Sequence, residues 1–125
     1  MAVYNEGPTK TLKAAGTIGR YERVKIDANG DWAQAGAGAG GKGIGIALDN
    51  VTVGQPLSAY LLNRGGTVKM KAAVAIAKGA LVYGGAAGKV NVTNTNCLEG
   101  MAVEASTADN DIIEVAVMNT SAITL

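Results

Sequence analysis

Short stretches in which apolar and polar residues alternate follow one another along the whole chain. Between positions 67 and 73, Val68, Met70 and Ala72 alternate with polar residues, as in a strand with one buried face. No segment keeps a helical period over three turns, so long helices are not expected. The pattern predicts strands at residues 11–14, 20–27, 32–35, 45–48, 56–62, 67–73, 81–83, 89–92, 98–105 and 112–118, and either one helical turn or a connector at 73–77.

Turn signals separate these strands at short intervals. The clearest is Asn29-Gly30, because both residues tolerate the positive φ angles of a tight hairpin turn. Many short strands about 8–12 residues apart predict an all-β fold, a small β-barrel or sandwich. Residues 1–9 have no periodicity and include Gly7-Pro8. We therefore predict an extended N-terminal arm at 1–9, a single β domain at 10–118 and a C-terminal tail at 119–125.

The sequence also contains a weak internal repeat. The stretch GIAL at 45–48 matches GMAV at 100–103, which lies 55 residues later. At the same offset three apolar pairs align: Leu57 with Ile112, Tyr60 with Val115 and Leu62 with Val117. Upstream, Val24 and the turn at Gly30 match Val82 and Gly88 after a slip of three residues. Two such units would face each other and close one small core; chance similarity in a sequence rich in Gly and Ala is the alternative.

Composition narrows the class of protein. The chain has 125 residues, which is the size of one domain, and a net charge of +1. Nucleic-acid binders carry a basic excess that neutralises phosphates, so no nucleic-acid partner is expected. No apolar run approaches the roughly 20 residues of a membrane helix, and the first residues do not resemble a signal peptide. We expect neither a membrane partner nor export, and we expect the protein to be made in the cytoplasm.

The residues needed for catalysis are scarce. The chain has no His, so neither Cys97 nor any Ser has an imidazole base, and Cys97 is interpreted as a small buried apolar residue. Glu99, Glu104 and Glu114 are expected on exposed strand faces. We therefore predict that the protein is not an enzyme and has no cofactor.

Two local motifs suggest ligand sites but fit them poorly. Residues 36–43 contain GxxxxGK, yet Gly43 replaces the Ser or Thr that would hold magnesium, and no helix is expected to follow. The stretch from Asp27 to Asp31 resembles the start of a calcium loop, but Trp32 stands where that loop needs glycine. A surface loop and a hairpin turn are the simpler interpretations, so no metal site is predicted.

The order of several segments resembles the capsid decoration (cement) protein family of tailed bacteriophages. The resemblance covers roughly residues 10–118. It is carried by YERVK at 21–25, KGIGIAL at 42–48, AIAKGALVY at 75–83, LEGMAVEA at 98–105 and IIEVAV at 112–117. None of these motifs is catalytic, and it is their order and spacing that carry the likeness.

The resemblance implies a structural virion protein made in the host bacterial cytoplasm. It would bind the major capsid protein on the outer surface of the mature head, as a homotrimer at three-fold positions, and stabilise the head against the pressure of packaged DNA. Because extended backbone can add to an open sheet, the arm is a candidate for capsid binding, through Ala2, Val3, Tyr4, Asn5, Pro8 and Lys10. Large aromatic rings are enriched at interfaces, which makes Trp32, Tyr60 and Tyr83 interface candidates, beside Tyr4 in the arm. The alternative function is a β-barrel binding module, displayed on a virion or free, for glycan or single-stranded nucleic acid.

Overall fold

The computed structural model describes residues 8–38, 41–64 and 66–118, and within them every predicted strand is present. The strands are β1 (Thr9–Lys13), β2 (Arg23–Ile26), β3 (Trp32–Gln34), β4 (Gly45–Ala47), β5 (Pro56–Leu61), β6 (Thr67–Lys71), β7 (Leu81–Gly84), β8 (Val90–Asn91), β9 (Leu98–Ala102) and β10 (Ile112–Val117). Two short 3-10 helices, η1 (Leu62–Arg64) and η2 (Ala86–Gly88), lie in loops. Residues 73–77 form a connector rather than a helical turn.

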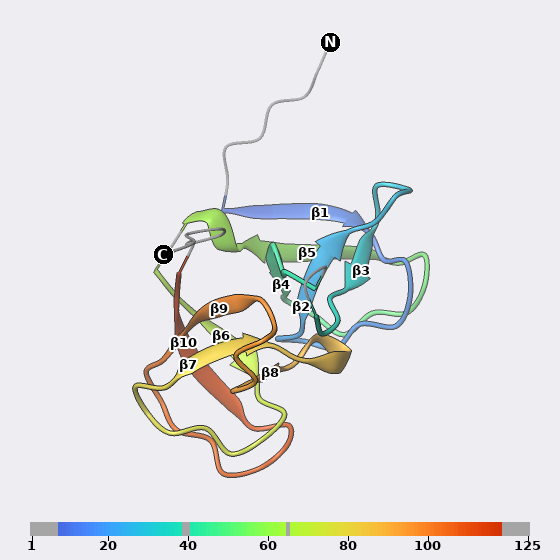
Figure 1. Ribbon diagram of the computed structural model, residues 1–125. Coiled ribbons are helices and arrows are strands. Elements are labelled where there is room, and N and C mark those ends of the chain that lie inside the picture. The colour runs from blue at the N-terminus through green and yellow to red at the C-terminus, as the bar shows by residue number, and fades with distance from the viewer. Residues whose placement is uncertain (1–7, 39–40, 65, 119–125) are drawn as a thin grey trace.

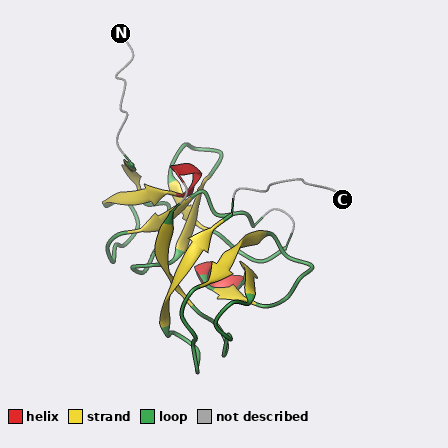
Figure 2. Ribbon diagram, turned by 90° about the vertical axis from the view of Figure 1, so that its left-hand side faces the viewer, coloured by secondary structure: helices red, strands yellow, loops and turns green. Residues whose placement is uncertain are grey.

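The strands form two five-stranded antiparallel sheets, one from each half of the chain (Figure 1). We call β1–β5 the N-terminal half and β6–β10 the C-terminal half. The strand orders are β1-β5-β4-β2-β3 and β6-β10-β9-β7-β8. The fold is all-β and sandwich-like and is not closed into a barrel. Strands make up most of its regular structure (Figure 2).

The identical order of the two sheets confirms the internal duplication. β1, β2, β3, β4 and β5 correspond to β6, β7, β8, β9 and β10. Pairing corrects the sequence alignment of the last strands by one residue. Gly45 pairs with Leu61 and Gly100 with Val117, so Tyr60 corresponds to Ala116 and Leu57 to Ile113.

Each half has its own core, so the expectation of one shared core is wrong. The N-terminal core consists of Ala14, Ile18, Val24, Trp32, Ala47, Val51, Leu57 and Ala59. The C-terminal core consists of Met70, Ala72, Ile76, Val82, Val90, Ala102, Ile113 and Val115, together with Ile46 and Leu62 from the N-terminal half. Two cores arise because each sheet covers its inner face with the loops of its own half, for example through the bridges Ile18–Val51 and Ile76–Ser106.

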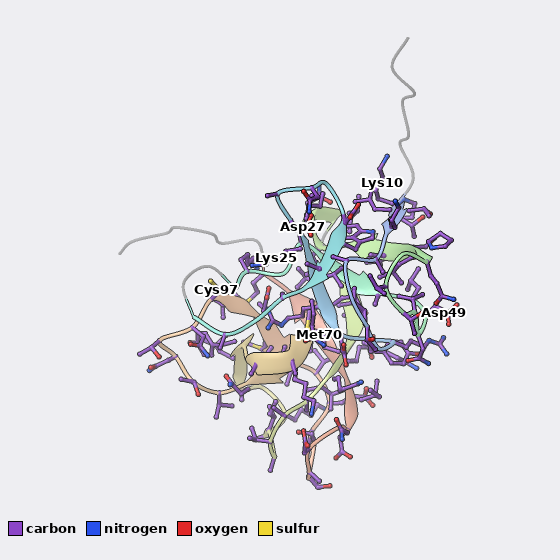
Figure 3. The ribbon with its side chains drawn as sticks, turned by 90° about the vertical axis from the view of Figure 1, so that its right-hand side faces the viewer. Lys10, Lys25, Asp27, Asp49, Met70 and Cys97 are labelled. Carbon is purple, nitrogen blue, oxygen red and sulfur yellow. The ribbon has the colours of Figure 1, made fainter. Side chains whose placement is uncertain are left out.

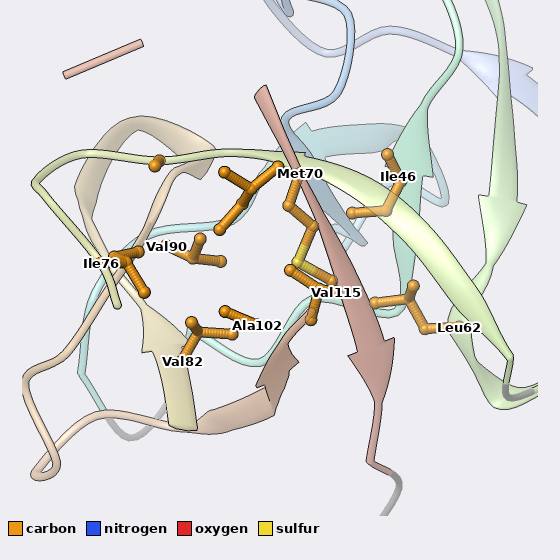
Figure 4. Close-up of a cluster of buried hydrophobic side chains, with 10 residues drawn as sticks. Ile46, Leu62, Met70, Ile76, Val82, Val90, Ala102 and Val115 are labelled. Atoms are coloured by element: carbon orange, nitrogen blue, oxygen red, sulfur yellow. The ribbon is translucent and has the colours of Figure 1, made fainter. Parts of the chain in front are cut away.

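Ile46 and Leu62 join the halves head to tail. They project from the N-terminal half and pack beside Met70 and Val115 in the C-terminal core (Figure 4). Among the described residues, the C-terminal half contributes no side chain to the N-terminal core. There the large ring of Trp32 stands where the C-terminal core has Val90, because both residues form the same parallel bridge to an alanine.

Candidate functional site

A buried guanidinium lies where the two halves meet. The Arg23 side chain is fully buried and its Nη1 donates a hydrogen bond to Glu99 Oε2 at 2.8 Å. The same guanidinium donates to five backbone carbonyls, those of Ala35, Gly36, Gly41, Gly85 and Lys89. One side chain of β2 therefore holds the glycine loop of its own half and the β7–β8 connection and β9 of the other half.

Glu99 is also fully buried, so the expectation that it lies on an exposed strand face is wrong. Its Oε1 accepts a hydrogen bond from Lys42 Nζ at 2.7 Å, and its Oε2 accepts one from the Gly43 backbone N–H at 2.9 Å. Lys42 Nζ also donates to the Leu98 carbonyl. The lysine of the GxxxxGK motif is thus committed to a buried ion pair, which explains the motif without a phosphate.

A second ion pair crosses the junction nearby. Lys71 Nζ lies 3.0 Å from Glu22 Oε2. Burial by itself raises the pKa of the Glu22 carboxyl. Hydrogen bonds from the Gly19 N–H and the Gln34 side chain, together with Lys71, outweigh burial and hold the pKa of Glu22 below its usual value. The carboxylate therefore stays charged and bound at neutral pH.

The interface candidates lie in different environments. Trp32 is fully buried, and its indole N–H donates to the Lys10 carbonyl at 3.2 Å, so it offers no surface to a partner. Tyr60 is half-buried and lines a hollow of about 200 Å³ between β4, β5 and β6. Tyr83 is half-buried on β7, beside Leu98. These rings do not form one stacking platform for single-stranded nucleic acid.

Of the six candidate residues of the arm, only Pro8 and Lys10 lie within the described residues. Ala2, Val3, Tyr4 and Asn5 lie outside the described residues. Pro8 is exposed, and its carbonyl accepts a hydrogen bond from the Leu61 N–H.

The sheet begins earlier than the sequence predicts. Lys10 lies within β1 at the rim of the molecule (Figure 3). The strand starts at Thr9, which pairs with Tyr60. Among the described strands β1 pairs only with β5, so its other edge is open.

Tyr21 is a junction residue that the sequence reasoning missed. It has φ of 70°, a conformation that costs free energy in any residue with a side chain. The guanidinium carbon of the neighbouring Arg20 lies over the Tyr21 ring, 4.7 Å from the ring centroid. The Tyr21 ring lines the same hollow as Tyr60. The available signal was the repeat, because the position corresponding to Tyr21 is Gly79, which also has positive φ.

The expected turn is confirmed. Asp27 Oδ1 accepts hydrogen bonds from the N–H groups of Asn29 and Asp31, which closes the hairpin between β2 and β3. Over the described ranges, no three His, Cys, Asp or Glu side chains come together as metal ligands would. In the same ranges no helix is long and apolar enough to cross a membrane.

The remaining surface carries several exposed apolar side chains. On the outer face of the C-terminal sheet these are Leu81, Met101 and Ile112, and on the N-terminal half Ile44 and Leu48 are also exposed. Large apolar side chains grouped on strands favour contacts with other proteins. The two halves thus present exposed apolar side chains on ordered β faces and are joined by a buried ion pair, an arrangement that favours contacts with other proteins.

Comparison with known protein families gives the class of this chain. The phage cement protein family matches residues 5–118, and the chain belongs to that family. It is therefore a structural protein of phage capsids. Comparison with curated proteins gives no match.

A solved structure shares the fold. The chain is similar to the head fiber gp8.5 N base in bacteriophage phi29, with a TM-score of 0.69 and 16% sequence identity. The similarity covers 88% of this chain and 92% of that chain. At this identity the likeness concerns the fold.

Proposed function

We propose that this protein binds the outer surface of the mature phage head and stabilises it against the internal pressure of packaged DNA. The family match over residues 5–118 carries the proposal. The binding partner is the major capsid protein, and the active form is a homotrimer at three-fold positions. A protein that binds only the expanded lattice stabilises that lattice by mass action, so the role needs neither a reaction nor a cofactor.

The arm is the proposed capsid-binding element. Residues 2–8 lead directly into β1, whose outer edge is open among the described strands. An extended segment that enters a sheet edge gains main-chain hydrogen bonds without any preformed pocket. Tyr60 and Tyr83 keep part of their rings exposed and remain candidates for further contact, whereas Trp32 does not.

The absence of a strong charge favours a protein partner. With a net charge of +1 the chain has little electrostatic attraction for nucleic acid or anionic membranes. The protein is then made in the cytoplasm of the host bacterium and ends on the virion surface. Capsid binding is expected to depend only weakly on salt.

Deletion of residues 2–7 tests the arm. The deletion leaves Thr9 and its pairing with Tyr60 in place, so the unfolding temperature should stay unchanged. Binding to expanded phage heads, measured by co-sedimentation, should be lost. Deletion of 119–125 at the other end is the matched control and should keep binding. Unchanged binding after the deletion of residues 2–7 would refute the role of the arm. A full-length chain that does not bind expanded heads would refute the capsid role itself.

A further inference from the structure

We propose that a second copy of this chain docks on the outer face of the C-terminal sheet, head to tail, as the C-terminal half docks on the N-terminal half within one chain. The proposal rests on the homotrimer of the proposed function and gives it a contact surface. It is carried by three comparisons between corresponding positions of the two halves.

The first comparison concerns a row of residues across each sheet. In the N-terminal half, Arg23 pairs with Ile46 and Ile46 with Tyr60, and the other half covers this row. Arg23 and Ile46 are fully or almost fully buried there. The corresponding row in the C-terminal half is Leu81, Met101 and Ala116.

That second row is apolar and uncovered. Leu81 and Met101 are each 38% exposed, although Met101 occupies the position of the buried Ile46. Within the described part of the chain, no further segment covers this row. The sheet face that contacts the other half in the N-terminal half is therefore uncovered in the C-terminal half.

The second comparison concerns the opposite side of the same contact. Met70 on β6 is fully buried because Ile46 and Leu62 pack on it. The corresponding residue of β1 is Leu12, which remains partly exposed. Hence the chain has an uncovered apolar face on its C-terminal half and a partly uncovered matching edge, at Leu12, on its N-terminal half.

The third comparison concerns the charges. Within the chain, Arg23 meets Glu99. The corresponding residues are Leu81 and Ile44, which are 38% and 40% exposed. At the copy–copy contact an apolar pair would thus replace the buried ion pair, and burial of two such side chains favours association without the desolvation cost of an ion pair.

The fit between copies is shallower than the fit within the chain. Trp32 already fills the N-terminal core where Ile46 and Leu62 enter the C-terminal one. Met101 is suited to such a contact because its unbranched side chain adapts to an irregular surface. A head-to-tail contact uses two different surfaces, so it closes into a ring when the rotation between copies permits.

Two charged substitutions test the contact. Leu81→Arg and Ile44→Glu should each raise the dissociation constant of the oligomer at least tenfold, as measured by sedimentation of the purified full-length chain. The double variant places Arg and Glu where Arg23 and Glu99 meet in the chain, so it should assemble more tightly than either single variant. Ile112→Glu is the matched control. Ile112 is 40% exposed on the same face, but its counterpart Pro56 lies outside the junction and is exposed.

The results separate this inference from the capsid role, because sedimentation is measured without heads. A wild-type chain that stays monomeric, or single variants that assemble as the Ile112→Glu control does, would overturn the inference while capsid binding stands. A double variant no tighter than the singles would refute the pairing of positions 44 and 81. An oligomer that dissociates as expected but never binds expanded heads would support the inference and remove the capsid role.

Discussion

Removal of the Glu99 charge should weaken the fold more than any other single change of a carboxylate to its amide. Glu99→Gln keeps the shape of the side chain but leaves Arg23 and Lys42 without their shared anion. The Arg23 guanidinium is fully buried and cannot turn to water. It keeps its carbonyl partners, yet carbonyl dipoles alone do not neutralise a positive charge.

The expected cost follows from this burial. Removal of one partner of a buried ion pair lowers the free energy of unfolding by about 3–5 kcal/mol, because the remaining charge is uncompensated. Domains have only about 5–15 kcal/mol of total stability, so the variant should be folded but fragile at room temperature. For a chain of this size the loss corresponds to a fall in melting temperature of roughly 10–20 °C.

Urea unfolding followed by Trp32 fluorescence measures this cost, because that ring is fully buried in the native state. Asp109→Asn is the matched control. Asp109 also forms an ion pair, with Lys89 at 2.8 Å, but its side chain is 57% exposed, and such surface pairs contribute less than about 1 kcal/mol. If the two variants lost the same free energy of unfolding, the argument from burial would be refuted.

Three further changes test other parts of the structure. The pKa of Glu22 is lower in the folded state than in the unfolded state, so its pairing with Lys71 contributes stability above the unfolded pKa. That stability is lost as the pH falls through the folded pKa. The free energy of unfolding, measured from neutral to acid pH, should therefore drop less in Glu22→Gln than in the wild type. Asn110 has φ of 72°, so Asn110→Ala should cost about 1–2 kcal/mol and Asn110→Gly much less, whereas equal losses in calorimetry would contradict a strained backbone. A Cβ at Gly100 would collide with the Ala116 carbonyl, but one at Gly45 meets its neighbours at 3.2 Å, so Gly100→Ala should lower the melting temperature further than Gly45→Ala.

Much of the local structure was readable in the sequence because its causes are local. Alternation of apolar and polar residues located every strand within the described residues, and Asn29-Gly30 located the hairpin turn. The weak match of GIAL and GMAV correctly indicated the duplication, since both stretches need glycine at the same close approach between strands. The last strands were misaligned by one residue, because apolar residues at many adjacent positions do not define a register.

The environment of individual side chains was decided by contacts distant in sequence. Alternation placed Glu99 on an exposed face, but Arg23, 76 residues away, pairs with it at the junction of the halves. Trp32 looked like an interface anchor, but its side chain is fully buried in the N-terminal core. A period of two residues tells which side chains share a face. Only the packing of the two halves decides which faces are buried, because that depends on what the rest of the chain brings against them.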